Sequence, residues 1–432
     1  MSATSLAPTL DAASVADTIS DVSLAATLHA PAAKVGAVLP TRDGGRTHTT
    51  VLPRIDVGAD ARPVVVDATR ERYEQMKSLG AGGMGEVALV RDHDIGREVA
   101  IKRMLPEAVR PATLARFVEE VRTIGTLEHP GIIPIHDVGL DAQGRYFFVM
   151  KFVDGDTLEH VIERLRARDP VYTARYSFEE RIRIAVQLLQ ALGYAHSHGI
   201  LHRDLKPANI MIGRFGEVVL MDWGISKRIG GAEPPADAAE APPEVVGEAS
   251  SLDGSKSRRA LQTQAGHLLG TPAYMSPEQA RGDNAALDAR SDLYSASVVF
   301  HELFALRHYL EEKTTLPGLL HGVVNEEPTK MALSLSSTNG AQGYPAELVH
   351  FVRKGLAKGI GARYQSADEM LAVLHAIQEG RIPVQCHATM TKRMAREAGR
   401  FVDRHPNVAF AGFIAGVGTF ITGLVMIATA AV

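Results

Sequence analysis

The pattern of hydrophobic and polar residues predicts a strand-rich region early in the globular part of the chain. Short apolar runs with strand periodicity recur there, and one stretch between them has apolar residues at helical spacing. The predicted strands span residues 86–90, 98–102 and 146–153, and the predicted helix spans 112–127.

After about Leu158 the periodicity becomes that of long helices, predicted over residues 180–198, 292–304, 346–357 and 367–378. A small strand-rich lobe followed by a larger helical lobe indicates an α+β fold with a cleft between the lobes. We place this globular region at residues 72–380, with the small lobe over 72–153 and the large lobe over 154–380.

Two segments depart from globular composition. Residues 1–71 are rich in Ala, Thr, Ser, Asp and Pro without sustained periodicity, so we expect them to be a disordered tail that buries too little apolar area to offset chain entropy. A Pro/Ala/Glu-rich stretch at about 230–260 is expected to be an insertion in a long loop.

The C-terminal part of the sequence suggests a membrane segment. The run from Val408 to Val432 has no charged residue, and a helix of that length reaches roughly 37 Å, enough to cross a bilayer. A buried C-terminal helix is the alternative. The preceding segment, residues 381–407, is basic and favours a cytoplasmic position, so we expect the bulk of the protein to lie in the cytoplasm, anchored at its C-terminus in the inner membrane. Gly412 and Gly416 have the spacing of a helix dimer contact, which suggests a homodimer.

Composition narrows the class of protein. The chain has 432 residues and a formal net charge of −4, whereas a general polyanion binder would be strongly basic, so we expect no nucleic-acid partner. The single cysteine, Cys386, excludes an intramolecular disulfide and a cysteine zinc site.

A glycine-rich turn provides the first candidate for phosphate binding. Gly80, Gly82 and Gly85 lie between alternating flanks, and glycine lets backbone N–H groups approach phosphates closely. A strand follows the last glycine, whereas a dinucleotide-binding motif would continue into a helix. Lys102 ends the next apolar strand and is a candidate phosphate ligand, with Glu119 or Glu120 as its counter-charge.

The most informative segment is HRDLKPAN. It places Asp204, Lys206 and Asn209 in one loop, and Asp222 follows at the end of a predicted strand. A carboxylate, a cation and two hard oxygen donors in this order suit a base, a phosphate ligand and a Mg²⁺ site.

Together these motifs resemble those of Hanks-type (eukaryotic-like) bacterial serine/threonine protein kinases, over about residues 72–380. The resemblance implies the bilobal protein kinase fold, ATP and Mg²⁺ (or Mn²⁺) as cofactors, and protein substrates. It implies that Asp204 accepts the substrate proton, that Lys206 neutralises the γ-phosphate, and that Asn209 and Asp222 hold the metal. The implied ATP-binding residues are Leu79, Gly80, Gly82, Gly85, Val87, Ala100, Lys102, Glu120, Met150, Val153 and Met211.

The resemblance also implies structural and regulatory residues. Glu278 would pair with Arg363, and Asp292 would support the catalytic-loop backbone. Arg203 and Thr271 fit a serine/threonine kinase controlled by its activation loop, with Thr263 as the candidate phosphosite and Ser255 or Ser257 as alternatives.

One departure leaves an alternative open. Trp223 stands where the family usually has Phe, which could change the balance between active and inactive forms. A membrane-anchored pseudokinase scaffold that binds nucleotide or partners is therefore the competing hypothesis, and a small-molecule kinase is a third.

Overall fold

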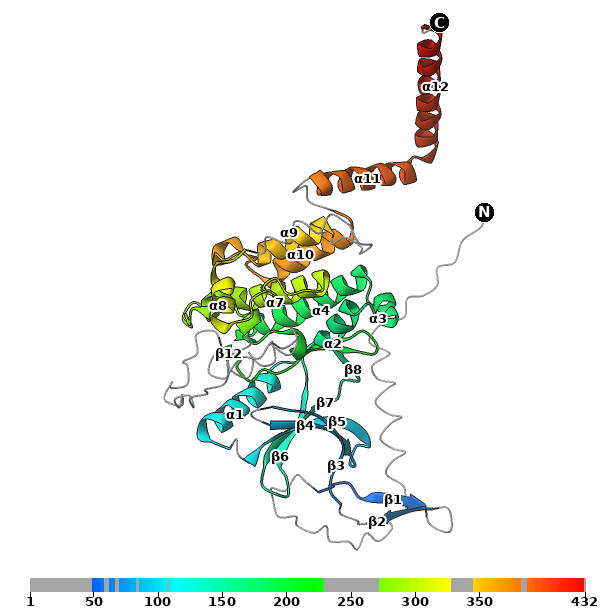
Figure 1. Cartoon of the computed structure of the whole chain (residues 1–432). Helices are drawn as coiled ribbons and strands as arrows, with labels where there is room; N and C mark the ends of the chain where they lie inside the picture. The colour runs from blue at the N-terminus through cyan, green and yellow to red at the C-terminus, as the bar shows by residue number, and fades with distance from the viewer. Residues whose placement is uncertain are drawn as a thin grey trace, which may run out of the picture. The chain divides into compact units, whose positions relative to one another are not determined.

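The computed structural model describes residues 49–57, 62–66, 70–82, 85–106, 109–228, 272–327, 345–381 and 387–430 (Figure 1). Its small lobe is a five-stranded antiparallel sheet with the order β3-β4-β5-β7-β6. The strands are β3 (Tyr73–Ala81), β4 (Gly85–Asp92), β5 (Arg97–Met104), β6 (Ile135–Leu140) and β7 (Tyr146–Lys151). Helix α1 (Pro111–Gly125) follows β5 and begins with a proline, whose fixed backbone suits a first helical turn.

The sequence predicted β4, β5, β7 and α1 with small boundary differences but did not delimit β6. Strand β6 lies at the edge of the sheet. Its residues alternate between half-buried and exposed, and none is fully buried, so its hydrophobic pattern is weak.

The expectation that residues 1–71 are disordered is wrong for part of that range. A hairpin of β1 (Arg54–Val57) and β2 (Pro63–Val66) lies within it. The chain just before the hairpin is fixed to the small lobe, because the backbone N–H groups of Val51 and Leu52 donate to the carboxylate of Asp94 at 2.9 Å. Residues 1–48, 58–61 and 67–69 of that range, and those at 230–260, lie outside the described part of the chain.

Helices make up most of the large lobe (Figure 1). They are α2 (Leu158–Arg166), α3 (Pro170–Arg175), α4 (Phe178–Ser197), α6 (Pro277–Ala280), α7 (Ala289–Ala305), α8 (Leu316–Asn325), α9 (Ala346–Gly355) and α10 (Ala367–Gln378). Four of these were predicted, and the strand-rich lobe followed by a helical lobe confirms the α+β prediction. Helix α7 is buried along almost its whole length, which makes it the central element of the lobe.

Short strands form two small sheets besides the five-stranded one and the β1–β2 hairpin. A three-stranded sheet has the order β11-β10-β8, from β8 (Gly155–Thr157), β10 (Ile210–Gly213) and β11 (Val218–Leu220). Strand β9 (Ile200–Leu201) pairs with β12 (Lys227–Arg228). The catalytic-loop residues therefore lie between β9 and β10, and the chain carries a 3₁₀ turn there at Pro207–Asn209.

Two further helices follow the large lobe, α11 (His387–Arg404) and α12 (Pro406–Ala430). They are separated at His405, because Pro406 lacks the N–H that would continue the helix. Among the residues described, no helix is both long and apolar enough to cross a membrane, so the predicted transmembrane helix is not supported.

Candidate active site

The buried carboxylate of Asp292 accepts hydrogen bonds from the backbone of the HRD loop. Asp292, on α7, is 1% exposed and accepts from the backbone N–H of His202 at 2.8 Å and of Arg203 at 2.9 Å. Its Oδ2 also lies 2.9 Å from Nε2 of His196, at the end of α4. Burial acts to raise the pKa of Asp292, but these hydrogen bonds and the nearby histidines outweigh it and lower the pKa. An ionised carboxylate thus fixes the backbone of Arg203, which adopts a left-handed φ of 67°.

The next residues place two charged groups and an amide together. Lys206 Nζ donates to Asp204 Oδ2 at 2.6 Å. Asn209 Nδ2 donates to the Asp204 backbone carbonyl at 2.9 Å, which turns the amide toward the loop. The sequence predicted these three residues as one cluster, and the structure brings them together.

Asp222 joins the cluster from the end of β11. The Met221 N–H donates to the Asn209 carbonyl at 2.8 Å, and the Met221 carbonyl lies 3.0 Å from His202 Nε2. These contacts bring the segment before Asp222 against the catalytic loop. Burial acts to raise the pKa of Asp222, but Lys102, Lys206 and His202 lower it overall. The carboxylate is therefore a charged hard donor, as a Mg²⁺ ligand must be.

The small lobe contributes the other cation. Lys102 Nζ donates to Glu120 Oε1 at 2.6 Å and lies 3.7 Å from Asp222 Oδ1. Of the two adjacent glutamates, Glu120 is the partner and is buried, which confirms the choice made from the sequence. Burial acts to lower the pKa of Lys102, but Glu120 and Asp222 together raise it, so the ammonium stays charged.

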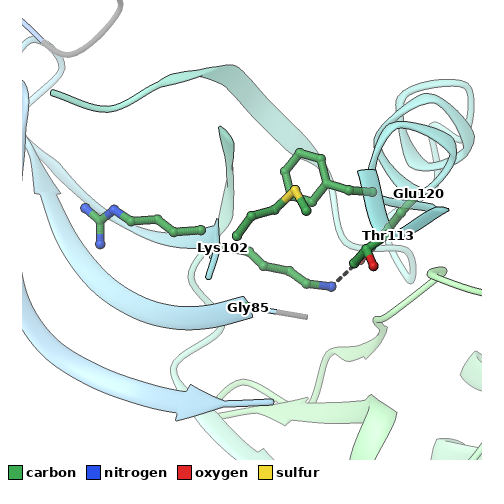
Figure 2. Close-up of a pocket in the computed structure, with 7 residues that line it drawn as sticks. Gly85, Lys102, Thr113 and Glu120 are labelled. Atoms are coloured by element: carbon green, nitrogen blue, oxygen red, sulfur yellow. Dashed lines mark hydrogen bonds and ion pairs between the residues drawn. The ribbon is translucent and has the colours of Figure 1, made fainter. Parts of the chain in front are cut away.

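Figure 2 shows a pocket beside this ion pair, with Lys102 reaching toward Glu120 across it. The lining includes Gly85 from β4, Lys102 from β5 and Glu120 from α1. A Cβ on Gly85 would clash with the backbone carbonyl of Arg103, so only glycine fits at this point of the loop. A Cβ added at Gly80 or Gly82 would meet no atom within 4 Å, so the space beside both residues is open.

The residues predicted for the adenine side lie on adjoining strands. Val87 is opposite Lys102 in the β4–β5 pair, and Ala100 is opposite Met150 in the β5–β7 pair. Met211, on β10, is half-buried and packs against the large-lobe core. Val153 is buried, and Leu79 is exposed at 42%. These positions come from both lobes, the strand pairs from the small lobe and Met211 from the large lobe.

The segment Ser276–Glu278 is joined to the rest of the large lobe by a buried ion pair. Arg363 donates to Glu278 through two nitrogens at 2.8 and 2.9 Å, as predicted, and Ser291 adds a third hydrogen bond to Glu278 at 2.7 Å. Burial acts to raise the pKa of Glu278, but Arg363 outweighs it and lowers the pKa. The neighbouring Gln279 donates to the Arg203 carbonyl at 2.8 Å, which joins this segment to the catalytic loop. Thr263, Thr271, Ser255 and Ser257 lie outside the described residues.

Trp223 is completely buried in the large-lobe core and contacts His202 edge-on, with ring centroids 4.7 Å apart. Because the ring is packed inward, Asp222 lies on the side of Lys102, and the Lys102–Glu120 pair is intact. The bulkier ring is thus accommodated without displacing the predicted metal ligand.

Sequence reasoning missed three residues of this framework, His196, Gln279 and Ser291. Each is an ordinary polar residue whose partner lies 13 to 96 positions away in the chain. The only local signal is that Gln279 is at the N3 position of a capping box whose N-cap is Ser276.

The comparison with protein families agrees with this geometry. A family model described as "Protein kinase domain" matches residues 73–373, so the chain belongs to the protein kinase family.

Its similar curated proteins are bacterial serine/threonine kinases, which confirms the resemblance seen in the sequence. Serine/threonine-protein kinase PknD of Protochlamydia amoebophila is 33% identical over 74% of this chain and 31% of that protein. A probable serine/threonine-protein kinase, SCO3848 of Streptomyces coelicolor, is 34% identical over 78% of this chain and 44% of that protein. PknB of Mycobacterium leprae is 33% identical over 72% of this chain and 44% of that protein. The chain spans less than half the length of these curated relatives.

Proposed function

We propose that this protein is a serine/threonine protein kinase that transfers the γ-phosphoryl group of Mg-ATP to hydroxyls of proteins. The observation that supports it most is the convergence of Lys102, paired with Glu120, on Asp222 across the lobes. This places a charged phosphate ligand beside a charged metal ligand, as phosphoryl transfer requires.

Each residue then has a chemical task. Asp204 accepts the proton of the attacking hydroxyl, and Lys206, 2.6 Å from it, neutralises charge on the transferred group. Lys102 orients the ATP phosphates. Asn209 and Asp222 would hold Mg²⁺, which supplies neutralisation of phosphate charge when bound. Asp292 positions the loop by fixing its backbone rather than by contacting substrate.

The pseudokinase alternative gains no support. The residues whose loss would define it, namely Lys102, Asp204, Asn209 and Asp222, are all present, and Trp223 leaves their contacts in place. The small-molecule kinase hypothesis likewise has nothing in its favour among the relatives, whose printed names are those of serine/threonine-protein kinases.

The test is a phosphorylation assay on the full chain. Purified protein is incubated with Mg-ATP and a generic protein acceptor, and phosphates are mapped by mass spectrometry beside an Asp204→Asn control. We expect phosphoserine or phosphothreonine in the wild type only, including autophosphorylation at Thr263. Nucleotide binding without phosphate on either protein would refute the proposal in favour of the scaffold.

The cellular location is a second part of the proposal. We propose that the C-terminal region attaches the chain to the cytoplasmic face of the inner membrane, because residues 408–432 lack charge and a basic segment precedes them. Cell fractionation of the full chain tests this. Recovery in the cytosol would contradict it. The homodimer through Gly412 and Gly416 stays a prediction, tested by cross-linking in the same membranes.

A further inference from the structure

Helix α11 has a narrow row of large apolar residues bordered by basic residues. At about 100° per residue, Met390, Met394 and Phe401 fall within one narrow sector, and Val402 lies outside it. The arginines of the helix, Arg393, Arg396, Arg400 and Arg404, fall in a neighbouring sector, with Arg404 and Arg393 nearest the apolar row. Glu397 also borders that row. A helix with an apolar row and a neighbouring basic sector is amphipathic.

The apolar side of α11 is uncovered. Met390, Met394, Phe401 and Val402 are between 47% and 61% exposed. Such a row of large apolar side chains on one exposed face marks an interaction surface rather than a core contact.

Two arginines of α11 lie near the end of the large lobe. Arg400 donates to the carbonyl of Gly380 at 3.5 Å, just after α10, and Arg396 lies near the same glycine. Those two arginines are therefore oriented toward the end of the large lobe. Arg393 and Arg404 lie nearer the apolar side around the helix, and Arg393 pairs with Glu397 at 2.7 Å.

We infer that α11 lies in the plane of an anionic membrane surface, with its methionines and Phe401 in the acyl boundary and Arg393 and Arg404 on headgroup phosphates. This deepens the proposed membrane attachment and does not depend on kinase activity. An interfacial helix has this combination of a large polar face, low overall hydrophobicity and flanking cations. A phospholipid layer takes both features at once, because long arginine side chains reach the headgroups while the apolar face is buried.

Charge and continuity favour the bilayer over a second copy of the chain. Helix α11 has five basic and two acidic residues in a chain of net charge −4, so two α11 helices would bring like charges together. Helix α12 begins two residues after α11 ends, contains no charged residue and exposes Phe410, Phe413 and Ile414. The apolar surface of α11 thus continues into a second apolar surface.

The test measures, in the full chain, whether single positions of α11 lie in water or in lipid. In a Cys386→Ser background, which removes the only cysteine, Met394→Cys, Phe401→Cys, Arg396→Cys and Gly399→Cys are each labelled with an environment-sensitive fluorophore. The proteins are reconstituted with phosphatidylcholine vesicles, with or without phosphatidylserine. We expect blue-shifted emission at 394 and 401 in the anionic vesicles and water-like emission at 396 and 399.

The arginines are tested in the same assay. Arg393→Gln and Arg404→Gln should each weaken docking of the label at 401 about fivefold, and added salt should weaken it further. Arg353→Gln, an exposed arginine on α9, is the matched control and should leave docking unchanged.

Several outcomes would overturn the inference. Water-like emission at all four positions on vesicles that retain the protein would show attachment without α11. An equal shift at all four would show burial on every side. A shift at 394 and 401 without vesicles that rises with protein concentration would identify a second copy as the partner. An Asp204→Asn chain should give the same label pattern as wild type, so loss of kinase activity and loss of docking are separate results.

Discussion

Two buried ion pairs, one in each lobe, have the same chemistry and different surroundings. The side chains of Glu278 and Arg363 are 6% and 0% exposed, and those of Glu120 and Lys102 are 4% and 16% exposed. In the large lobe, Arg363 also donates to the carbonyls of Ala357 and Lys358, and Ser291 donates to Glu278. In the small lobe, Lys102 donates one hydrogen bond to Glu120, and both line a pocket.

This difference separates a structural pair from a functional one. A buried pair whose remaining donors and acceptors are all satisfied fixes elements relative to one another, since breaking it leaves an uncompensated charge. The cation of the small-lobe pair lies 3.7 Å from Asp222, the predicted metal ligand, where it is available to a bound phosphate. We therefore expect substitutions in the large-lobe pair to reduce stability and substitutions in the small-lobe pair to reduce activity.

The largest expected effect is on activity. Lys102→Met should lower the rate of phosphate transfer on the order of 10²- to 10³-fold, because a preorganised cation on the phosphates is lost. The melting temperature should change little. Burial acts to raise the pKa of Glu120, so without Lys102 the carboxyl takes up a proton and no uncompensated charge stays buried. Kinetics and calorimetry measure the two quantities.

Lys77→Met, which changes an exposed lysine on β3 of the same sheet, is the matched control and should leave both quantities unchanged. A Lys102→Met protein that loses stability in proportion to activity would break the distinction between the two pairs.

The second effect is on stability. Glu278→Gln should lower the free energy of unfolding by about 3 kcal/mol, because Arg363 is left buried without its counter-charge. Chemical denaturation measures it. Arg214→Met, which removes an exposed ion pair with Asp154, should cost less than about 1 kcal/mol. Equal losses in the two variants would show that the large-lobe pair has no special structural role.

The third effect is a pH dependence. The folded-state pKa of Glu278 is lowered, so below about pH 4.3 the unfolded chain binds more protons at this residue than the folded chain. The stabilisation is fully present above that pH and is lost as pH falls through the folded-state pKa. The difference in unfolding free energy between wild type and Glu278→Gln should therefore narrow as the solution is acidified from pH 5. A difference that stays constant would contradict the lowered pKa.

The smallest effect concerns Trp223. Trp223→Phe should lower the free energy of unfolding by about 1 kcal/mol, because a fully buried ring loses packing contacts. It should change the transfer rate less than threefold, roughly within 0.6 kcal/mol, because the indole Nε1–H has no hydrogen-bond partner among the described residues. A large rate change with unchanged stability would instead give Trp223 a role in activation, which stopped-flow and steady-state assays would detect.

Most of the chemistry could be predicted from the sequence because it is local. Asp204, Lys206 and Asn209 lie within six consecutive residues of one loop, and the strand after Gly85 already distinguished this glycine turn from a dinucleotide-binding one. The long helices were also predictable, since α4, α7, α9 and α10 each have apolar residues at helical spacing.

The resemblance to a known family supplied the long-range pairs that local pattern could not. Nothing in the periodicity connects Glu278 with Arg363, or selects Glu120 over Glu119, although the family motif indicated both. The hairpin β1–β2 was missed because its apolar residues are exposed and its composition resembles a disordered tail.

The sequence by itself therefore determined the class of protein, the two lobes and the identity of the reacting groups, because these depend on residue type and short spacing. Only the tertiary structure decided that His196 and Gln279 join the framework of the catalytic loop, and that Trp223 packs inward. These contacts join residues distant in the chain, and their strength comes from burial and from the alignment of hydrogen-bond partners, which exist only once the helices have packed.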